Sequence, residues 1–511
     1  MSTQFSMADA WVQRFNEGAA HFNAGRLPEA ENCFRQAMQQ QPNHPTIVMN
    51  LGLTLRALNR PAEALEAFRT VLRLKRDHVD AIAQFAECFA AMGLGNEAYA
   101  VYKALLAATP TYPGGALSAG NLLMRMDMPE QAVIAYRNAV AADPGCATST
   151  NNLGAALMSV LQEDEAAVVY RRALRMEPTS PEYHKNLGTC GLKRGDFSEG
   201  GREYEWREEQ AAWKWKRVFP GKIRWDGAAP IDGRTFLVHF EQGIGDTFQF
   251  MRYTSVLKRR GARVIFECQK PLKRFLACAP DIDILVAHGE PLPDFDLHAP
   301  LMSLPYLCGS TPNTIPADTV PYLHAEPALI DQWRHRIEAG EAARGGREFR
   351  VGINWHANEV NRSIPLELFE PIARLTGVRL YSLQQVVGLD QLEKLRDRFG
   401  IIDWAAEMDV STGGFVDTAA VMANMDLIIS CDSAVNHLAG SMGLTSALAA
   451  RWFGDWRWMR IPDTTPWYPT MRIFRMVRRN DWAEVMGRVC GHVAALRDAR
   501  TSDGHHSGRT A

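Results

Sequence analysis

Apolar and small residues recur with a period of 34 along about the first two hundred residues. Three columns keep this period without a slip: the small residues Gly18, Gly52, Ala86, Gly120, Gly154 and Gly188; then Ala30, Ala64, Ala98, Ala132, Ala166 and Gly200; then Phe34, Phe68, Tyr102, Tyr136, Tyr170 and Tyr204. The pattern predicts pairs of helices in which the small residue lets the second helix approach the first and the aromatic residue fills the gap between successive units. Because one unit cannot bury its apolar face alone, the units are expected to stack into a solenoid with a concave groove.

A fourth column predicts where the second helix of each unit stops, because proline has no N–H to donate and clashes with the preceding turn. It consists of Pro42, Pro110, Pro144 and Pro178, and Arg76 departs from it. The spacing resembles the tetratricopeptide repeat and predicts about six repeats over residues 1–210. The resemblance implies a groove that binds a peptide or protein; a spacer or dimerisation arm is the alternative. Gly200 departs from the alanine column and marks the last unit.

The period fails in "GGREYEWREEQAAWKWKRVFPGKIRWDG", where tryptophan, lysine and arginine are dense. We expect residues 211–232 to be a linker that packs its tryptophans between two domains. Stacking of these aromatic residues on a nucleic acid is the alternative.

Short apolar runs alternate with helical stretches from about residue 235, which predicts parallel sheets and an α/β region. Helices are expected near Asp246 and Pro271 and in "DTAAVMANM", and residues 338–348 are expected to be a hinge between a half at 233–345 and a half at 346–495. Residues 496–511 are expected to be a disordered tail, with His505–His506 an accident of composition. The expected strands are "TFLVHF", "ARVIFEC" and "IDILVA" in the first half, and "FRVGINW", "RLYSLQ", "DLIISC" and "SALAARW" in the second.

Composition restricts the partners. The 511 residues carry a net charge of −2, so there is no global basic field to hold nucleic acid or an anionic membrane. Nine scattered cysteines without a C-x-x-C pair argue against a disulfide framework and a zinc site. No leader and no apolar stretch of membrane-spanning length is evident, so we expect a cytoplasmic protein without a transmembrane segment.

An acidic residue follows a glycine turn in "FLVHFEQGIGDTFQFMRY". A dinucleotide-binding motif would need a third glycine where Phe248 stands, and the G-K-[ST] of a phosphate loop is absent. Gly243 and Gly245 instead predict a tight turn that leaves Asp246 at the start of a helix. Asp246 is then either a helix N-cap or a group with a chemical role.

Two further strand ends carry polar residues, and ligands of open α/β sheets bind at such ends. Asp432 and Ser433 precede an apolar helix, whose N-terminus offers unpaired N–H groups to a diphosphate. His437 lies one turn later, and a buried core histidine is the alternative for it. In "NWHANEVNRSIPLELF", Asn358, Asn361 and Arg362 form a polar loop; Arg362 either neutralises a phosphate or is a surface arginine.

Several of these stretches together resemble bacterial tetratricopeptide proteins whose C-terminal half is similar to the ADP-heptose:lipopolysaccharide heptosyltransferases, glycosyltransferase family nine. The resemblance spans about residues 235–490 and rests on "EQGIGDTFQFMRY", "DFDLHAPLMSLPYL", "NRSIPLELF", "CDSAVNHLAGSMG" and "DWRWMR…TPWYPTMRIFR". It implies a GT-B fold of two Rossmann-like halves, with the acceptor in the first half and a nucleotide-sugar in the second.

The resemblance also implies roles for single residues. Asp246 is the base, although a helix N-terminus favours its ionised form and so makes it a weaker base. Arg362, in the loop that also holds Asn358, contacts the donor phosphates, and Asp432, Ser433 and His437 bind the donor. The sequence departs from the family pattern at Ala434–Val435, where glycine and proline are usual, and at Gln384, where an acid is usual.

Metal ions and cofactors are not part of this interpretation. Two D-x-D patterns, 281–283 and 294–296, lie outside the strand-end loops, so we expect neither a metal nor a cofactor. The residues Trp456, Trp458 and Trp467 either stack on a base or sugar or pack under a loop.

The sequence therefore predicts a metal-independent, inverting glycosyltransferase whose repeats recruit an acceptor, either a protein or a lipid-linked glycan. The alternative is a non-catalytic scaffold with a degenerate transferase domain that binds protein partners through its repeats.

Overall fold

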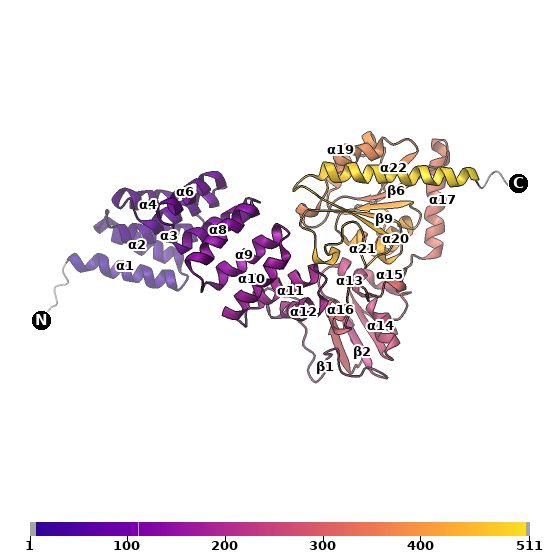
Figure 1. The fold of residues 1–511 in the computed structure, drawn as a ribbon, viewed down its shortest axis with the longest axis horizontal. Coiled ribbons are helices and arrows are strands. Elements are labelled where there is room, and N and C mark those ends of the chain that lie inside the picture. The colour runs from indigo at the N-terminus through magenta and orange to yellow at the C-terminus, as the bar shows by residue number, and fades with distance from the viewer. Residues whose placement is uncertain (1–6, 111, 507–511) are drawn as a thin grey trace. The chain divides into compact units, whose positions relative to one another are not determined.

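The chain divides into two compact units, Met1–Tyr183 and His184–Ala511. The computed structural model describes residues 7–110 and 112–506, and Figure 1 shows the helical unit in indigo and purple and the α/β unit in magenta to yellow. The described helices of the first unit, unit 1, are α1 (Met7–Asn23), α2 (Leu27–Gln40), α3 (Pro45–Ala57), α4 (Pro61–Leu74), α5 (Val79–Ala91), α6 (Gly95–Ala108), α7 (Pro113–Arg125), α8 (Pro129–Ala142), α9 (Ala147–Ser159) and α10 (Glu163–Met176).

The glycine and aromatic columns meet inside each helical pair of unit 1. A Cβ atom added to Gly154 would lie 2.5 Å from the Tyr170 ring, and one added to Gly18 would lie 2.8 Å from the Phe34 ring. The small residue therefore admits the ring of its own repeat. The ring packs on the helix that precedes it in the same pair. That it also fills a gap between successive repeats stays a prediction.

The second helix of each pair ends two residues before the proline column. Helices α2, α6, α8 and α10 end at Gln40, Ala108, Ala142 and Met176. Helix α4 ends at the equivalent Leu74, although Arg76 replaces the proline. Proline is therefore not required to stop the helix at this position.

The sixth helical pair, α11 (Pro181–Lys193) and α12 (Phe197–Tyr204), differs from the other five. A Cβ atom on Gly191 would lie 2.7 Å from the Cα atom of Gly200, so the two backbones touch where the column has glycine instead of alanine. A Cβ atom on Gly201 would lie 2.6 Å from Tyr306 of the α/β region. The division between the units falls after Tyr183, earlier than the boundary predicted at 210, because most of this pair packs with the second unit.

The first half of unit 2 contains a parallel five-stranded sheet of order β1-β5-β2-β3-β4. Three of the strands were predicted, whereas the short β1 and β5 were not. The strands are β1 (Ile223–Arg224), β2 (Thr235–His239), β3 (Arg263–Cys268), β4 (Ile284–Ala287) and β5 (Leu297–Pro300). The helices are α13 (Ile244–Phe250), α14 (Tyr253–Arg259), α15 (Lys273–Leu276), α16 (Leu304–Leu307) and α17 (Pro327–Arg344).

The second half contains another parallel five-stranded sheet, of order β10-β9-β8-β6-β7. All four predicted strands form, and the edge strand β10 was missed. The strands are β6 (Phe349–Asn354), β7 (Val378–Ser382), β8 (Leu427–Ser430), β9 (Ser446–Ala450) and β10 (Met471–Arg475). The helices are α18 (Glu370–Ala373), α19 (Leu389–Phe399), α20 (Val416–Met422), α21 (Ala434–Ser441) and α22 (Trp482–His506). Unit 2 is thus an α/β structure with two parallel sheets.

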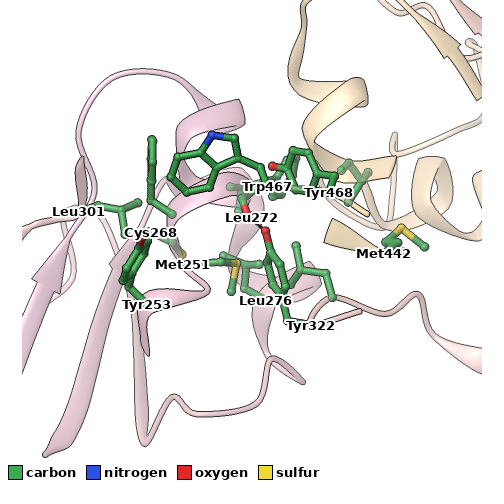
Figure 2. Packing of buried hydrophobic residues seen from close by; sticks show 14 of the residues in the cluster. Met251, Tyr253, Cys268, Leu272, Leu276, Leu301, Tyr322, Met442, Trp467 and Tyr468 are labelled. Atoms are coloured by element: carbon green, nitrogen blue, oxygen red, sulfur yellow. Dashed lines mark hydrogen bonds between the residues drawn. The ribbon is translucent and has the colours of Figure 1, made fainter. Parts of the chain in front are cut away.

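One hydrophobic core joins the two halves of unit 2. Figure 2 shows Trp467 and Tyr468 of the second half among Met251 and Tyr322 of the first, and all four side chains are buried. Polar contacts reinforce this core, because Arg252 donates to the Trp467 carbonyl oxygen at 2.6 Å and to the Tyr322 hydroxyl at 2.9 Å. The two halves of unit 2 are therefore joined where α13 packs against α21.

The C-terminal segment is helical for longer than predicted. Helix α22 continues to His506, so the part of the expected tail between residues 496 and 506 is wrong; the rest of it, from residue 507, lies outside the described residues. The expected hinge at 338–348 contains the end of α17 and the loop to β6. Among the described helices, none is both long and apolar enough to cross a membrane.

Candidate functional site

The carboxyl ends of both sheets face one cleft of about 840 Å³ within unit 2. Seven segments line it: the β2–α13 turn, the loops after β3, β6 and β7, the starts of α20 and α21, and the turn at Asp455–Arg457. Nine of the residues singled out from the sequence belong to this lining: Gly243, Gly245, Asp246, Asn358, Arg362, Gln384, Asp432, Ser433 and His437. Parallel strands bring these distant segments together because their loops all emerge at the same edge.

Asp246 is held by contacts on both carboxylate oxygens. It is the third residue of α13, and Oδ2 accepts the backbone N–H of Gly243 at 3.0 Å. The N-cap is therefore Gly243, and Asp246 reaches back to it as the acid of a capping box does. Oδ1 accepts a hydrogen bond from Nη2 of Arg457, with which it forms an ion pair. Burial raises the pKa of Asp246 even though Arg457 lowers it, contrary to the lowering expected from the helix N-terminus.

The glycines of the turn serve a different purpose from the predicted one. Gln242, with a φ of 61°, is the residue with the left-handed conformation, whereas Gly243 has a φ of −82°. Gly245 matters for space, because a Cβ atom there would lie 2.9 Å from the imidazole of His437. This glycine therefore lets α13 and α21 approach each other across the cleft.

Arg457 and Asp455 are functional candidates that the sequence reasoning did not assign. The Arg457 guanidinium lies between Asp246 and Asp455, and its Nη1 donates to Asp455 at 2.8 Å. The Cζ atom of Arg457 lies 4.6 Å from the ring centroid of Trp456 and 5.5 Å from that of Phe250. Burial opposes its charge, but the two carboxylates keep the pKa of Arg457 raised. The stretch "DWRWMR" carried the only sequence hint, as part of the family resemblance.

The start of α21 combines a helix N-terminus that the Ser433 side chain does not cap with a half-buried acid, Asp432. Ser433 is the N-cap, and its hydroxyl donates to Oδ1 of Asn354 at 2.6 Å, away from the helix. Burial raises the pKa of Asp432, and the nearby charge of Asp455 raises it further. Burial also opposes the ionisation of Asp455, but Arg457 outweighs it and the pKa of Asp455 lies below its ordinary value. The second half therefore presents one acid that ionises readily and one that resists ionisation.

His437 is a buried histidine that also lines the cleft. Its Nδ1 hydrogen-bonds the Tyr468 hydroxyl at 3.1 Å, and its ring stacks on Trp458 with centroids 5.1 Å apart. Burial lowers the pKa of His437 to about 3, so the ring is neutral at physiological pH. The structure thus supports the interpretation of His437 as a buried core histidine. One edge of its ring faces Gly245.

The loop after β6 places a cation in the cleft. Arg362 donates to both carboxylate oxygens of Glu359, at 3.0 and 3.1 Å, and Asn358 in the same loop is exposed. An anion that binds Arg362 must therefore compete with Glu359. Asn361, the third polar residue of this loop, does not line the cleft.

Gln384 supports that loop. Its Oε1 accepts from Nδ2 of Asn354 at 2.8 Å and from the backbone N–H groups of Trp355 and His356, and its Nε2 donates to the His356 carbonyl oxygen at 3.2 Å. A carboxylate could not make the last of these bonds, since it has no N–H. The glutamine here therefore fixes the loop that carries Arg362.

The remaining sequence alternatives are settled by position. Trp456, Trp458 and Trp467 are buried in the core that joins the halves, so the packing alternative is the one that forms. Asp283 and Asp294 precede β4 and β5 at the opposite edge of the sheet and form ion pairs with Lys258 and Lys222. Within the described residues, no group of three or more histidine, cysteine or acidic side chains could hold a metal ion.

Comparison with known proteins identifies the repeats. Two family models described as "Tetratricopeptide repeat" match residues 15–79 and 55–117. The chain therefore carries tetratricopeptide repeats, which confirms that part of the prediction. Such repeats are associated with binding of protein partners.

A curated relative extends the similarity beyond the repeats. Protein FlbA of Caulobacter vibrioides is 25% identical over an alignment that covers 61% of this chain and 54% of that protein. The chain thus spans about half the length of this relative. Because unit 1 ends at residue 183 of 511, a match over 61% of the chain includes part of unit 2.

Solved structures resemble a third or more of the chain. MamA protein is 18% identical over 34% of this chain and 96% of that chain, with a TM-score of 0.30. A thermophilic tetratricopeptide protein of Thermus thermophilus is 27% identical over 33% and 92%, with a TM-score of 0.28. PilW is 15% identical over 40% and 95%, with a TM-score of 0.36. These scores are too low to support an argument beyond the repeat matches.

Proposed function

We propose that the protein binds a polypeptide partner through unit 1 and that unit 2 is a metal-independent, inverting glycosyltransferase of GT-B type. The donor in this proposal is a nucleotide-sugar, and the acceptor is the recruited protein or a lipid-linked glycan. One observation carries it: nine residues chosen from separate stretches of sequence for this chemistry line a single cleft. The repeats support the recruiting role.

Asp246 is the base of the proposed reaction. An acceptor hydroxyl attacks the anomeric carbon, the new C–O bond forms as the bond to the diphosphate breaks, and the hydroxyl proton passes to the Asp246 carboxylate. The ion pair with Arg457 and the Gly243 N–H orient this carboxylate. Burial, which raises its pKa, strengthens it as a base.

The departing diphosphate is stabilised from the second half. The N-terminus of α21 supplies N–H groups and a partial positive charge, and Arg362 supplies a full charge after it leaves Glu359. Gln384 keeps the Arg362 loop in place, and the neutral His437 adds no charge of its own. The cleft therefore separates a proton acceptor on one side from an anion-binding region on the other.

A screen of nucleotide-sugar donors and one substitution test the proposal. Thermal-shift measurements with UDP-, GDP-, ADP- and CMP-sugars should show one nucleotide class raising the melting temperature. Asp246→Asn should lower sugar transfer, or slow hydrolysis of that donor, by about a hundredfold or more while the thermal shift remains. Asp294→Asn, an exposed carboxylate on the other side of the sheet, is the matched control and should leave both unchanged. Full activity of Asp246→Asn would remove its role as base.

A non-catalytic scaffold is the second candidate. Two observations favour it: the Asp246 carboxylate already forms an ion pair with Arg457, and Arg362 already forms one with Glu359. The family matches at the repeats favour it as well. A chain that binds a protein partner but shows no thermal shift with any of the four nucleotide-sugar classes would establish the scaffold and exclude the transferase.

A further inference from the structure

The aromatic residue of the sixth helical pair does not pack as its counterparts do. In four of the earlier pairs the ring packs on the glycine of its own repeat, as Tyr170 does on Gly154. In the sixth pair the atoms nearest to a Cβ atom on Gly188 would be backbone atoms, with the nitrogen of Tyr204 at 2.5 Å. The backbones of α11 and α12 therefore leave no room for a ring between them, and the side chain of Tyr204, the last residue of α12, lies elsewhere.

Tyr204 contacts the β2–α13 turn. Its hydroxyl accepts a hydrogen bond from Nε2 of Gln242 at 3.4 Å. Gln242 lines the cleft and has a φ of 61°, a conformation that a residue other than glycine keeps only where neighbouring contacts hold it. The next residue, Gly243, donates its N–H to Oδ2 of Asp246 at 3.0 Å. A chain of contacts thus leads from the last repeat to the Asp246 carboxylate.

The same ring contacts the turn on the other side of the cleft. The ring centroids of Tyr204 and Trp456 are 6.0 Å apart. Trp456 lies between Asp455 and Arg457 in the sequence, and the Cζ atom of Arg457 is 4.6 Å from its ring centroid. Burial raises the pKa of Tyr204, and the charges of Arg207 and Arg457 lower it, which agrees with this proximity. Tyr204 therefore adjoins both turns that supply the ion pair between Asp246 and Arg457.

The position of Tyr204 separates it from any ligand in the cleft. It is half-buried against the core that joins the two halves of unit 2. Among the described residues, the lining of the cleft includes Gln242 and Arg457 but not Tyr204 or Trp456. An effect of Tyr204 on chemistry in the cleft must therefore pass through the residues that it holds.

We propose that Tyr204 is a positioning residue of the cleft, which holds the β2–α13 turn and the Asp455–Arg457 turn in place and so fixes how Arg457 orients the Asp246 carboxylate. The inference rests on the proposed function, in which that carboxylate is the base. A base must be aligned with the proton that it accepts, and a displacement of about 1 Å can lower the rate about a hundredfold. The last repeat then serves the reaction itself as well as the recruitment of an acceptor.

Hydrogen exchange of the full chain tests the contacts of Tyr204 without any activity. In Tyr204→Ala, peptides that cover residues 242–250 and 453–461 should exchange their backbone hydrogens about tenfold faster, because both turns lose a contact that holds them. Peptides that cover β3 should exchange at their original rate. The matched control is Tyr170→Ala, which removes the equivalent ring of the fifth pair and should leave both turns unchanged. Unchanged exchange of the two turns in Tyr204→Ala would overturn the proposal.

Hydrolysis of a nucleotide-sugar tests the positioning role, and it needs no recruited acceptor. The donor is the one among the UDP-, GDP-, ADP- and CMP-sugars that raises the melting temperature, and calorimetric titration counts its binding sites. Tyr204→Ala should lower kcat per binding site about tenfold while changing the KM of the donor less than about twofold. Tyr204→Phe, which keeps the ring, should retain more than about half of kcat. A merely structural role would reduce the number of binding sites and leave kcat per site unchanged, and that outcome would contradict the inference.

Two arrangements keep this inference separate from the proposed function and from a failure to fold. If the unaltered chain hydrolyses none of the four donor classes, the transferase and its positioned base fail together, whereas the holding of the two turns is decided by hydrogen exchange alone. If Tyr204→Ala does not fold, Tyr204→Leu takes its place, because leucine fills much of the same space without an aromatic face. It should accelerate exchange of both turns about threefold, and rates equal to those of the unaltered chain would count against Tyr204.

Discussion

Ion pairs of unit 1 and unit 2 lie at different depths. In unit 1, Arg60 pairs with Glu63 at the surface, with 38% and 52% of the two side chains exposed. In unit 2, Arg207 and Glu241 form a pair that is 0% and 1% exposed. In unit 1 one apolar contact recurs in four of the five described helical pairs, whereas unit 2 contains polar contacts that occur once.

The difference determines how each unit tolerates change. The ring-on-glycine contact of unit 1 recurs at Gly18, Gly52, Gly120 and Gly154, so the loss of one leaves the others intact. The Arg207–Glu241 pair has no copy. It joins the segment after α12 to the end of β2, immediately before the turn that carries Asp246, so its loss should affect both the stability of unit 2 and the shape of the cleft.

The largest expected effect comes from breaking this buried pair. Arg207→Met leaves Glu241 buried without a compensating charge and should lower the free energy of unfolding of unit 2 by about 3–5 kcal/mol. Urea unfolding followed by tryptophan fluorescence measures unit 2, because Trp11 is the only one of the 13 tryptophans in unit 1.

The control for this substitution is Arg60→Met in unit 1, which removes pairs with Glu63 and Glu31 and should lower the free energy of unfolding of unit 1, followed by far-ultraviolet circular dichroism, much less than Arg207→Met lowers that of unit 2. Combining Arg207→Met with Glu241→Met should recover part of the loss, since no isolated charge then remains. Equal costs for the two single substitutions would contradict the contrast between the units.

An intermediate effect on the free energy of unfolding is expected when the pH is lowered. The folded-state pKa of His437 is about 3, below the ordinary value near 6.5, so the unfolded chain binds the proton more tightly. Stability is therefore full above pH 6.5 and falls as the pH is lowered toward 3, and this histidine alone should cost about 2 kcal/mol at pH 5. His437→Gln should reduce the slope of unfolding free energy against pH, measured by tryptophan fluorescence in urea between pH 7 and 5. An unchanged slope would show that His437 is not buried as a neutral group.

The smallest effect concerns the repeats. Gly154→Ala places a methyl group 2.5 Å from the Tyr170 ring, which costs about 1–3 kcal/mol, while alanine in a helix regains about 1 kcal/mol. We expect a net loss near 1 kcal/mol in far-ultraviolet circular dichroism melting. Gly114→Ala is the control, because its added methyl group meets neighbours no closer than 3.5 Å, and it should be neutral or stabilising. A stabilising Gly154→Ala would disprove the tight ring contact.

The repeats were predictable because each contact lies within a short, recurring stretch. Seven strands of unit 2 were predictable for a similar reason, since buried parallel strands are continuous apolar runs. The missed strands lack that feature: β1 has two residues, β5 reads "LHAP", and β10 alternates arginine with apolar residues as an edge strand does.

The predicted site residues could be chosen one strand end at a time, but their partners could not. Arg457 meets Asp246 across 211 residues of sequence, and no local pattern relates the two. The role of Gly245 could not be predicted locally either, because a glycine is needed there to leave room for His437 on another helix. Contacts between elements, which depend on how the sheets are placed, account for what the sequence did not predict.

The close approach of Gly245 to His437 makes one residue size decisive for the spacing of two helices. A side chain at residue 245 would meet the imidazole at 2.9 Å, so any larger residue would force α13 and α21 apart. The next residue, Asp246, would then move relative to Arg457, its ion-pair partner in the second half. The spacing of the helices and the ion pair are therefore linked through two adjacent residues, 245 and 246.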